Sequence, residues 1–463
     1  MSRLPQYLLP VFLLGVGAAL ITAAYREEAD KEWKTWRKAP VAVNLPAGET
    51  ERCLTCHEGI EPISDAHPVE VIGCVSCHGG NGLALDKERA HAGLKGGRNP
   101  GDLSVAREAC GGNGINCHVG RESFYRSPVD TVPLVPMATK AGEIAMSARD
   151  LGWQPDGLSR YGVRPVPSPG EEQRGSGVER GLADPASGLQ AYSAGDQPAE
   201  KKLADNCLAD CHLWAGLPDK EQVSPQKRGD GRFLGGCSAC HVPFRPGGVY
   251  EGEDRTVDRT AAGHAPRHEF TTAIPYTACN ACHNQGVHSL ARMEFLQRDD
   301  IPPGAITDPR ADRQAAYYIP LARYAGCEVT LDCIDCHTRN EVMGDGHLYG
   351  NKEKAQVIRC YNCHGTAAQG PRWQRIESAD ADAIWAVRAM TTEFPELEQG
   401  DVVAMTDKGE PMINVRLEAG QPVLYSKIDG RRIIIPQVAG SACTQDTERQ
   451  RGDDCHNCHD VSG

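Results

Sequence analysis

Seven pairs of cysteines in this 463-residue chain share one spacing and one neighbour. In each pair two residues separate the cysteines, and a histidine directly follows the second cysteine. Zinc knuckles, thioredoxin-like redox pairs and disulfide scaffolds also use paired cysteines, but none of them needs a histidine there. Histidine fills only 16 of 463 positions, so seven chance occurrences are negligible. The pattern C-x-x-C-H predicts covalent attachment of haem c. The seven cysteine pairs are Cys53 and Cys56, Cys74 and Cys77, Cys237 and Cys240, Cys279 and Cys282, Cys333 and Cys336, Cys360 and Cys363, and Cys455 and Cys458.

The spacing suits the chemistry of that attachment. Two thiols bond the two vinyl groups of one porphyrin edge, and the adjacent histidine reaches under the ring to bind the iron as its proximal ligand. The predicted proximal ligands of these seven sites are His57, His78, His241, His283, His337, His364 and His459.

On these motifs, which extend from residue 53 to residue 459, the chain resembles a multihaem c-type cytochrome. The resemblance implies a mostly irregular and α-helical fold with little regular secondary structure, in which haems fill the core. The low aromatic content, 6 %, agrees with such a core. The resemblance also implies attachment of haem outside the cytoplasm, so we expect the haem domain in the periplasm or outside the cell.

Two further segments carry stretched versions of the motif. In NCLADCH, three residues separate Cys207 from Cys211, and His212 takes the proximal position. In CGGNGINCH, six residues separate Cys110 from Cys117 before His118, and three glycines would let the loop bulge while both thiols reach one porphyrin. The alternative for this second segment is a disulfide or free thiols, with His118 as the distal ligand of another haem. The chain is expected to bind nine haems c, or eight if the Cys110/Cys117 site is not used.

Seven of the 16 histidines remain after the nine proximal candidates. Bis-histidine cytochromes need one distal histidine per haem, so we expect most of these seven to be distal iron ligands. Nine haems cannot share seven such ligands, and at least two irons then need another ligand or an open position. Met137, Met146 and Met343 are the nearest methionines, although methionine is more often a packing residue. The candidate distal ligands are His67, His91, His264, His268, His288, His347 and His456.

Two cysteines, Cys327 and Cys443, lie outside all of these motifs. One interpretation is a disulfide between them. Another joins Cys443 to Cys455 and His456 as a very long attachment motif, which would compete with the ordinary site for Cys455.

The N-terminal region contains an uncharged apolar run at residues 7–24, whose 18 residues are about the minimum for a membrane-spanning helix. The candidate cleavage site at its end is mediocre, which favours an uncleaved signal anchor over a cleaved signal peptide. The basic residues that follow the run oppose the positive-inside tendency, but haem attachment outside the cytoplasm outweighs that argument.

The spacing of the motifs divides the chain into segments. Val- and Ile-rich runs separated by KG, EAG and DG turn signals predict a small antiparallel sheet within 401–438, and ADADAIWAVRAM suggests a short helix before it. The expected segments are a transmembrane signal anchor (1–25), a linker (26–45), an N-terminal haem module (46–125), an irregular or wrapping segment (126–206), a central module of five haems (207–380), a β-rich haem-free insertion (381–442) and a C-terminal haem (443–463).

Two functions compete, and we favour the first. The chain could carry electrons between a membrane quinol-linked donor and a periplasmic or extracellular acceptor, with haem filaments as a variant of this role. It could instead be a nitrite, hydroxylamine, sulfite or tetrathionate oxidoreductase with one open iron. No C-x-x-C-K site supports the enzyme, and no catalytic residue stands out.

The net charge of −13 bears on partners. Haem propionates add further negative charge, so a basic cytochrome or a basic patch on a membrane complex would dock by electrostatic steering. Nucleic acid binding is improbable for so acidic a chain. Oligomerisation is compatible with the sequence.

Overall fold

The computed structural model describes part of the chain, and it combines short helices with small sheets. Among the described residues, the longest helix after the first one has 10 residues. The described residues are 5–29, 34, 39–97, 99–111, 118, 124–167, 188–193, 195, 208, 212–214, 235–243, 249–260, 264–276, 278–279, 295–297, 318–320, 326–350, 352–451, 455 and 459.

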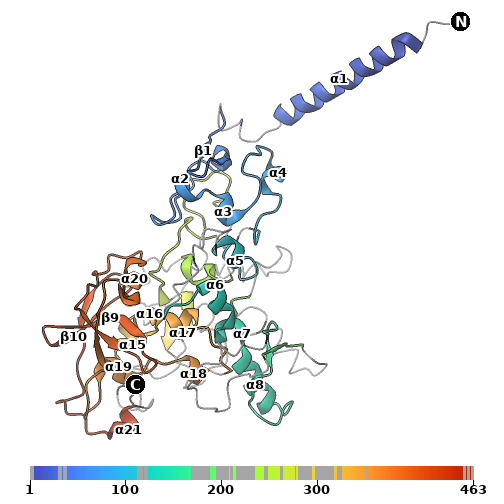
Figure 1. Cartoon of the computed structure of the whole chain (residues 1–463). Helices are drawn as coiled ribbons and strands as arrows, with labels where there is room; N and C mark the ends of the chain where they lie inside the picture. The colour runs from blue at the N-terminus through green and yellow to red at the C-terminus, as the bar shows by residue number, and fades with distance from the viewer. Residues whose placement is uncertain are drawn as a thin grey trace.

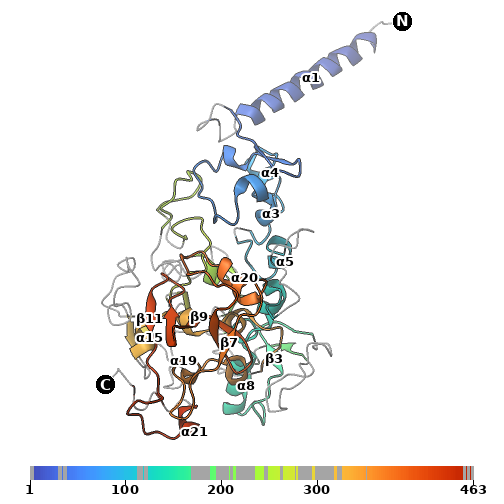
Figure 2. The ribbon, with the colours of Figure 1, turned by 60° about the vertical axis from the view of Figure 1, so that its left-hand side comes forward.

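The first helix, α1 (Pro5–Ala29), has 25 residues and stands off from the rest of the chain (Figures 1 and 2). Leu14 and Ile21 are more than 70 % exposed on it. None of the helices in the described part of the chain meets the length and hydropathy of a membrane span.

The N-terminal haem segment folds into a two-stranded ribbon and five short helices. Two of these helices, η2 (Cys53–Thr55) and α3 (Val75–His78), lie on predicted motifs, where one helical turn brings the amide of the motif histidine to the carbonyl of the first cysteine. The elements are β1 (Val43–Asn44), β2 (Thr50–Glu51), η2 (Cys53–Thr55), α2 (Val69–Ile72), α3 (Val75–His78), α4 (Lys87–His91) and α5 (Ala106–Ala109).

The segment expected to be irregular, 126–206, begins instead with a helical run. In its last helix the buried residues Ala141, Ile144, Ala145 and Ala148 recur at the helical spacing, so this apolar stripe explains the helix. The elements are α6 (Pro128–Thr131), η3 (Val132–Leu134), α7 (Pro136–Thr139), α8 (Ala141–Asp150) and the parallel pair β3 (Tyr161–Gly162) and β4 (Gln190–Ala191).

The central haem segment contains further one-turn helices, three of which lie on motif residues. The elements are α12 (Ser238–His241), the antiparallel pair β5 (Phe295–Gln297) and β6 (Tyr318–Pro320), α15 (Gly326–Thr330), α16 (Cys333–Cys336), α17 (Arg339–Met343), α18 (Lys352–Ala355) and α19 (Cys360–His364).

A five-stranded antiparallel sheet in the order β11-β10-β9-β8-β7 follows. It lies where the valine- and isoleucine-rich runs predicted a sheet, but its first strand precedes residue 381. Ala419 and Gly420 join β9 to β10 with φ angles of 48° and 82°, as a two-residue hairpin turn requires. The elements are β7 (Trp373–Arg375), α20 (Asp382–Arg388), β8 (Val402–Met405), β9 (Pro411–Glu418), β10 (Gln421–Tyr425), β11 (Arg432–Ile434) and α21 (Thr447–Gln450).

The two faces of this sheet pack against different partners, because side chains alternate along each strand. Val403 and Ile413 face a cluster with Ile384 and Val387 of α20. Ala404 and Met412 lie in a second cluster, against which the motif residues Cys336 and Cys363 pack. The second face of the sheet therefore supports the two predicted haem sites of α16 and α19.

Candidate haem-binding sites

Each described C-x-x-C-H motif forms a tight turn. The amides of His57, His78, His241, His337 and His459 donate to the carbonyl of the first cysteine of their own motif at 2.8 to 3.0 Å. This turn places the histidine directly beside the two thiols, as attachment of one porphyrin requires. Eight candidate residues lie outside the described part of the chain: Cys117, Cys207, Cys211, Cys282, His283, His288, His456 and Cys458.

The stretched segment at 110–118 closes with the same hydrogen bond. The amide of His118 donates to the carbonyl of Cys110 at 3.1 Å, although eight positions separate the two residues. The histidine therefore has the same relation to the first cysteine as in an ordinary motif.

Three motif histidines each lie beside a histidine from outside the motifs. The ring centroids of His57 and His91 are 6.1 Å apart. Those of His78 and His268 are 6.0 Å apart. His118 pairs with His67, also at 6.0 Å, with nearly parallel ring planes at 11°.

These distances match two imidazoles on opposite sides of one iron. A metal–imidazole bond is about 2 Å long, and the ring centroid lies roughly 1 Å behind the bonding nitrogen, so the two centroids are about 6 Å apart. His67 follows no cysteine. If a haem lies between His67 and His118, only His118 is in a position to be its proximal ligand.

The structure does not bring every candidate distal histidine to a motif. The ring of His347 lies 6.1 Å from that of Tyr349, and its Nδ1 lies 3.2 Å from Asp345 Oδ1. His264 is described and half-buried. A distal role for these two residues stays a prediction.

Several of these histidines are anchored through Nδ1, which leaves Nε2 for a metal. Among the distal candidates, His67 Nδ1 contacts Ser64 Oγ at 2.7 Å and His268 Nδ1 contacts Glu61 O at 2.9 Å. Among the motif histidines, His241 bonds the carbonyl of Thr271 at 2.9 Å, and His364 bonds that of Pro436 at 2.7 Å.

Two other motif histidines are anchored by carboxylates. His57 Nδ1 lies 2.8 Å from Asp254 Oδ2, and the side chain of Asp254 is fully buried. His337 Nδ1 lies 3.0 Å from Glu341 Oε2, whose side chain is 4 % exposed.

His212 differs from these residues. Its Nε2, rather than its Nδ1, lies 2.9 Å from the carbonyl of Leu208. The imidazole would have to turn before Nε2 could bind an iron.

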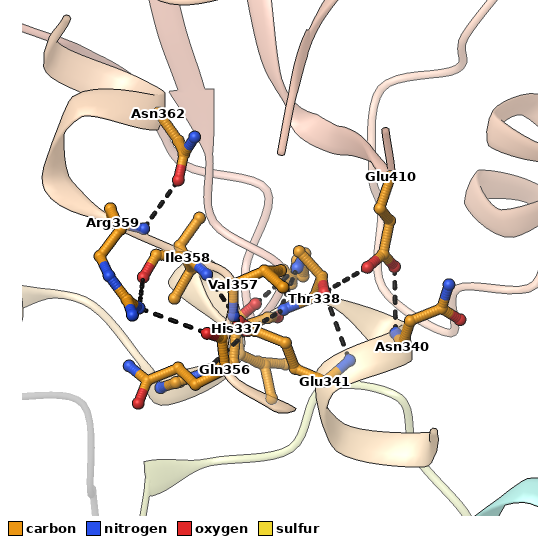
Figure 3. Close-up of polar contacts among 12 residues, drawn as sticks. His337, Thr338, Asn340, Glu341, Gln356, Val357, Ile358, Arg359, Asn362 and Glu410 are labelled. Carbon is orange, nitrogen blue, oxygen red and sulfur yellow. Dashed lines mark hydrogen bonds and ion pairs between the residues drawn. The ribbon is translucent and has the colours of Figure 1, made fainter. Parts of the chain in front are cut away.

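The sheet holds the His337 site through buried polar groups (Figure 3). Glu341 accepts hydrogen bonds from the amides of Val357 and Ile358. Glu410, which immediately precedes β9, accepts from Thr338 Oγ1 and from the amide of Asn340. The predicted haem-free insertion therefore supports a predicted haem site.

A buried lysine adds to this support. Lys427 Nζ donates to the carbonyls of Ile334 at 2.5 Å and His337 at 3.2 Å, and its amide donates to Asp335 Oδ1. The turn after β10 thus holds the backbone of the Cys333–His337 motif.

The environment shifts the pKa values of these imidazoles in two directions. Burial lowers the pKa of His78 to about 4, and the neighbouring His268 contributes. The hydrogen bond and charge of Asp254 raise the pKa of His57 despite burial. Burial would lower the pKa of His337, but Glu341 outweighs it and raises the value. The lowered pKa favours the neutral imidazole of His78, and the raised pKa values favour the protonated form of His57 and His337.

First cysteines of different motifs lie together in pairs. The Sγ atoms of Cys53 and Cys74 lie within 4.8 Å of each other, and Cys110 lies beside Cys237. Cys279 and Cys333 form the third such pair. Glu51 lies at the first pair, within 4.8 Å of both thiols, but its carboxylate already accepts from the amides of Cys74 and Val75.

Backbone contacts join the N-terminal and central segments beside the second pair. The side-chain amide of Asn99 donates through Nδ2 to the carbonyl of Gly235 at 3.1 Å. The backbone amide of Cys237 donates to the carbonyl of Gly101 at 2.9 Å. A Cβ at Gly236 would lie 2.0 Å from the Gly101 oxygen, so only glycine fits this approach.

The remaining sulfur candidates have ordinary surroundings. Met137 and Met343 pack in an apolar cluster with Leu103 and Val135. No disulfide joins Cys327 to Cys443: Cys327 packs against the sheet cluster, and Cys443 Sγ accepts from Gln450.

The carboxylates that anchor His57 and His337 were not among the residues predicted from the sequence. Glu341 had a readable signal, because Thr338-Arg-Asn-Glu341 is a capping box directly after a motif. Asp254 had none, since it is 197 residues from His57.

The described residues fit covalent haem: the motif turns place thiols beside a histidine, and the ring pairs have the spacing of two axial ligands. Comparison of the chain with protein-family models, with curated proteins and with solved structures gives no match.

Proposed function

We propose that this protein is a multihaem c-type cytochrome that transfers electrons through nine covalently bound haems. The observation that carries the proposal is the set of three histidine pairs at 6.0 to 6.1 Å, each joining one motif histidine to one histidine outside the motifs. Structural histidines would have no reason to combine in this way. An iron between the two rings of each pair accounts for both the combination and the distance.

Nine haems rather than eight follow from the stretched motif at 110–118. Its support is the bond from the His118 amide to Cys110 O and the pairing of His118 with His67. Three of the seven spare histidines then serve His57, His78 and His118. The other four cannot serve six irons, so at least two haems have a different distal ligand or an open position.

The cysteine pairs support close approach of successive haems. Because each of these cysteine sulfurs would bond a porphyrin edge, neighbouring cysteines of two motifs bring two porphyrin edges together. The pairs Cys53–Cys74, Cys110–Cys237 and Cys279–Cys333 therefore join six of the haems two by two.

Further contacts connect these haem pairs into one series. Cys240 lies near Cys279, which joins the second pair to the third. Cys327 lies near Cys363, and both pack against the cluster that Cys336 also contacts, which continues the series to the Cys360 site. Lys95 Nζ donates to the carbonyls of Ser76 and Glu108, next to the Cys77 and Cys110 sites. We infer that the haems at Cys53, Cys74, Cys110, Cys237, Cys279, Cys333 and Cys360 follow one another in that order.

The proposed location is outside the cytoplasm, where haem c is attached in this family. We propose α1 as the anchor, with the Cys53 end of the haem series toward the membrane donor. Its exposed apolar side chains support this role. The net charge of −13 supports basic redox partners.

Low-temperature EPR of the oxidised holoprotein tests electron transfer against the enzyme alternative. We expect low-spin ferric signals that do not change with nitrite, sulfite or hydroxylamine, and any high-spin signal should be equally unresponsive. A dominant high-spin signal that shifts with one of these compounds would overturn the electron-carrier proposal in favour of a multihaem reductase.

A further inference from the structure

The four motif histidines with described Nδ1 hydrogen bonds fall into two classes. His241 and His364 bond neutral backbone carbonyls. His57 and His337 bond carboxylates. The two carboxylates come from different parts of the chain, so the similarity does not follow from the motif itself.

Both carboxylates are held in place as buried hydrogen-bond acceptors. Asp254 accepts at Oδ1 from the amide and the hydroxyl of Thr256, both at 2.8 Å, and at Oδ2 from His57. Its side chain has no exposed surface. A carboxylate with several donors is stabilised in its charged form.

Glu341 has an even larger donor set. Its Oε1 accepts from the amides of Val357 and Ile358, and its Oε2 accepts from the amide of Thr338 at 3.1 Å and from His337. Figure 3 shows Glu341 next to His337, with Val357 and Ile358 on the neighbouring segment. These four hydrogen bonds fix the position of the carboxylate.

A carboxylate at Nδ1 changes the electronic character of the imidazole. It draws the Nδ1 proton toward itself and makes Nε2 a stronger electron donor to a metal. A stronger donor stabilises ferric over ferrous iron and lowers the reduction potential, whereas a neutral carbonyl does so less.

We propose that Asp254 and Glu341 are positioning residues that set the haems of His57 and His337 at lower potentials than those of His241 and His364. This inference rests on the proposed function. It places one low-potential haem at the N-terminal end of the inferred series and another near its far end.

The test uses the full-length holoprotein and its Asp254→Asn and Glu341→Gln variants. Each variant keeps an oxygen acceptor but removes the charge. Potentiometric titration followed by EPR should show one haem in each variant reduced more easily, with about a tenfold change in its ferric-to-ferrous ratio at a fixed potential, or about 59 mV. The g-values of that same haem should change as its ligand becomes a weaker donor.

Glu51→Gln is the matched control. It removes a buried carboxylate that bonds the amides of Cys74 and Val75 and is not hydrogen-bonded to a motif histidine. Loss of charge alone should move neighbouring potentials without changing the g-values of the His57 haem. Asp254→Glu, which retains the charge, should keep the low potential.

The two levels of the proposal fail differently. Absence of covalent haem from the wild-type protein would refute the proposed function. Unchanged potentials and g-values in Asp254→Asn and Glu341→Gln proteins that carry the full haem complement would refute this inference alone. An equal shift of the haem potential in the Glu51→Gln control, with the same change in g-values, would refute it as well.

Discussion

The amide of His118 donates a hydrogen bond to the carbonyl of Cys110 at 3.1 Å, the same contact that closes five ordinary motifs in which only four positions separate the two residues. The CGGNGINCH segment therefore ends as a haem attachment turn ends. This relationship supports the expectation of nine haems rather than eight, and nine haems leave too few histidines to serve every iron.

Replacement of Cys110 tests this site. Cys110→Ala should lower the haem content by one, because its thiol is one of the two that bond the porphyrin. Intact mass and the pyridine haemochrome assay measure the loss. Cys443→Ala is the control, since Cys443 lies outside the motifs and should leave the count unchanged. An unchanged count in Cys110→Ala would mean that the segment attaches no haem through this residue.

The pairing of His67 with His118 predicts the effect of removing a distal ligand. His67→Gly should convert one low-spin haem to a high-spin state, and added imidazole should restore the low-spin signal by occupying the space of the lost ring. Ser64→Ala removes only the Nδ1 partner of His67 and should keep the haem low-spin. A His67→Gly protein with all its original low-spin signals would contradict the pairing.

The ring planes of two pairs predict different EPR signals. His67 and His118 are nearly parallel at 11°, which gives a rhombic low-spin signal, whereas His57 and His91 are inclined at 64°, which favours a strongly anisotropic signal with one large g-value. His91→Gly should remove the strongly anisotropic component, and His67→Gly the rhombic one. The opposite assignment would show that the ligand pairs are wrong.

Burial raises the pKa of Glu410 to about 7, against an ordinary value of 4.5. The folded protein therefore binds this proton more tightly than the unfolded chain, and the stability that the proton contributes is lost as the pH rises through 7. At pH 8, the free energy of unfolding of Glu410→Gln, measured in urea, should exceed that of the wild type by up to about 3 kcal/mol. The difference should vanish below pH 4.5.

The control for this prediction is Glu377→Gln, which removes the same charge from an exposed position. It should change the unfolding midpoint little at either pH. A Glu410→Gln variant that is less stable than wild type at pH 8 would show that the ionised carboxylate stabilises the fold, contrary to the expected sign.

Local features of the fold were predictable from the sequence. The motif turns depend on residues four positions apart, and the hairpin at Ala419–Gly420 follows from its turn signal. The helix Ala141–Asp150 was also readable from its apolar spacing, although the proline- and glycine-rich sequence after it masked the signal.

Long-range features were not predictable. The sequence leaves open which spare histidine meets which motif, because His67 crosses to His118 and His268 to His78 from distant segments. The burial of Asp254 beside His57 depends on the same tertiary packing. No spacing rule connects these residues.

Intact-mass measurement of the full-length protein, produced with a cytochrome c maturation system, tests the central claim most directly. We expect a mass increased by nine covalently bound haems. A mass without covalent haem would contradict the proposed function, and an increase of eight would contradict the assignment of Cys110, Cys117 and His118 as a haem site.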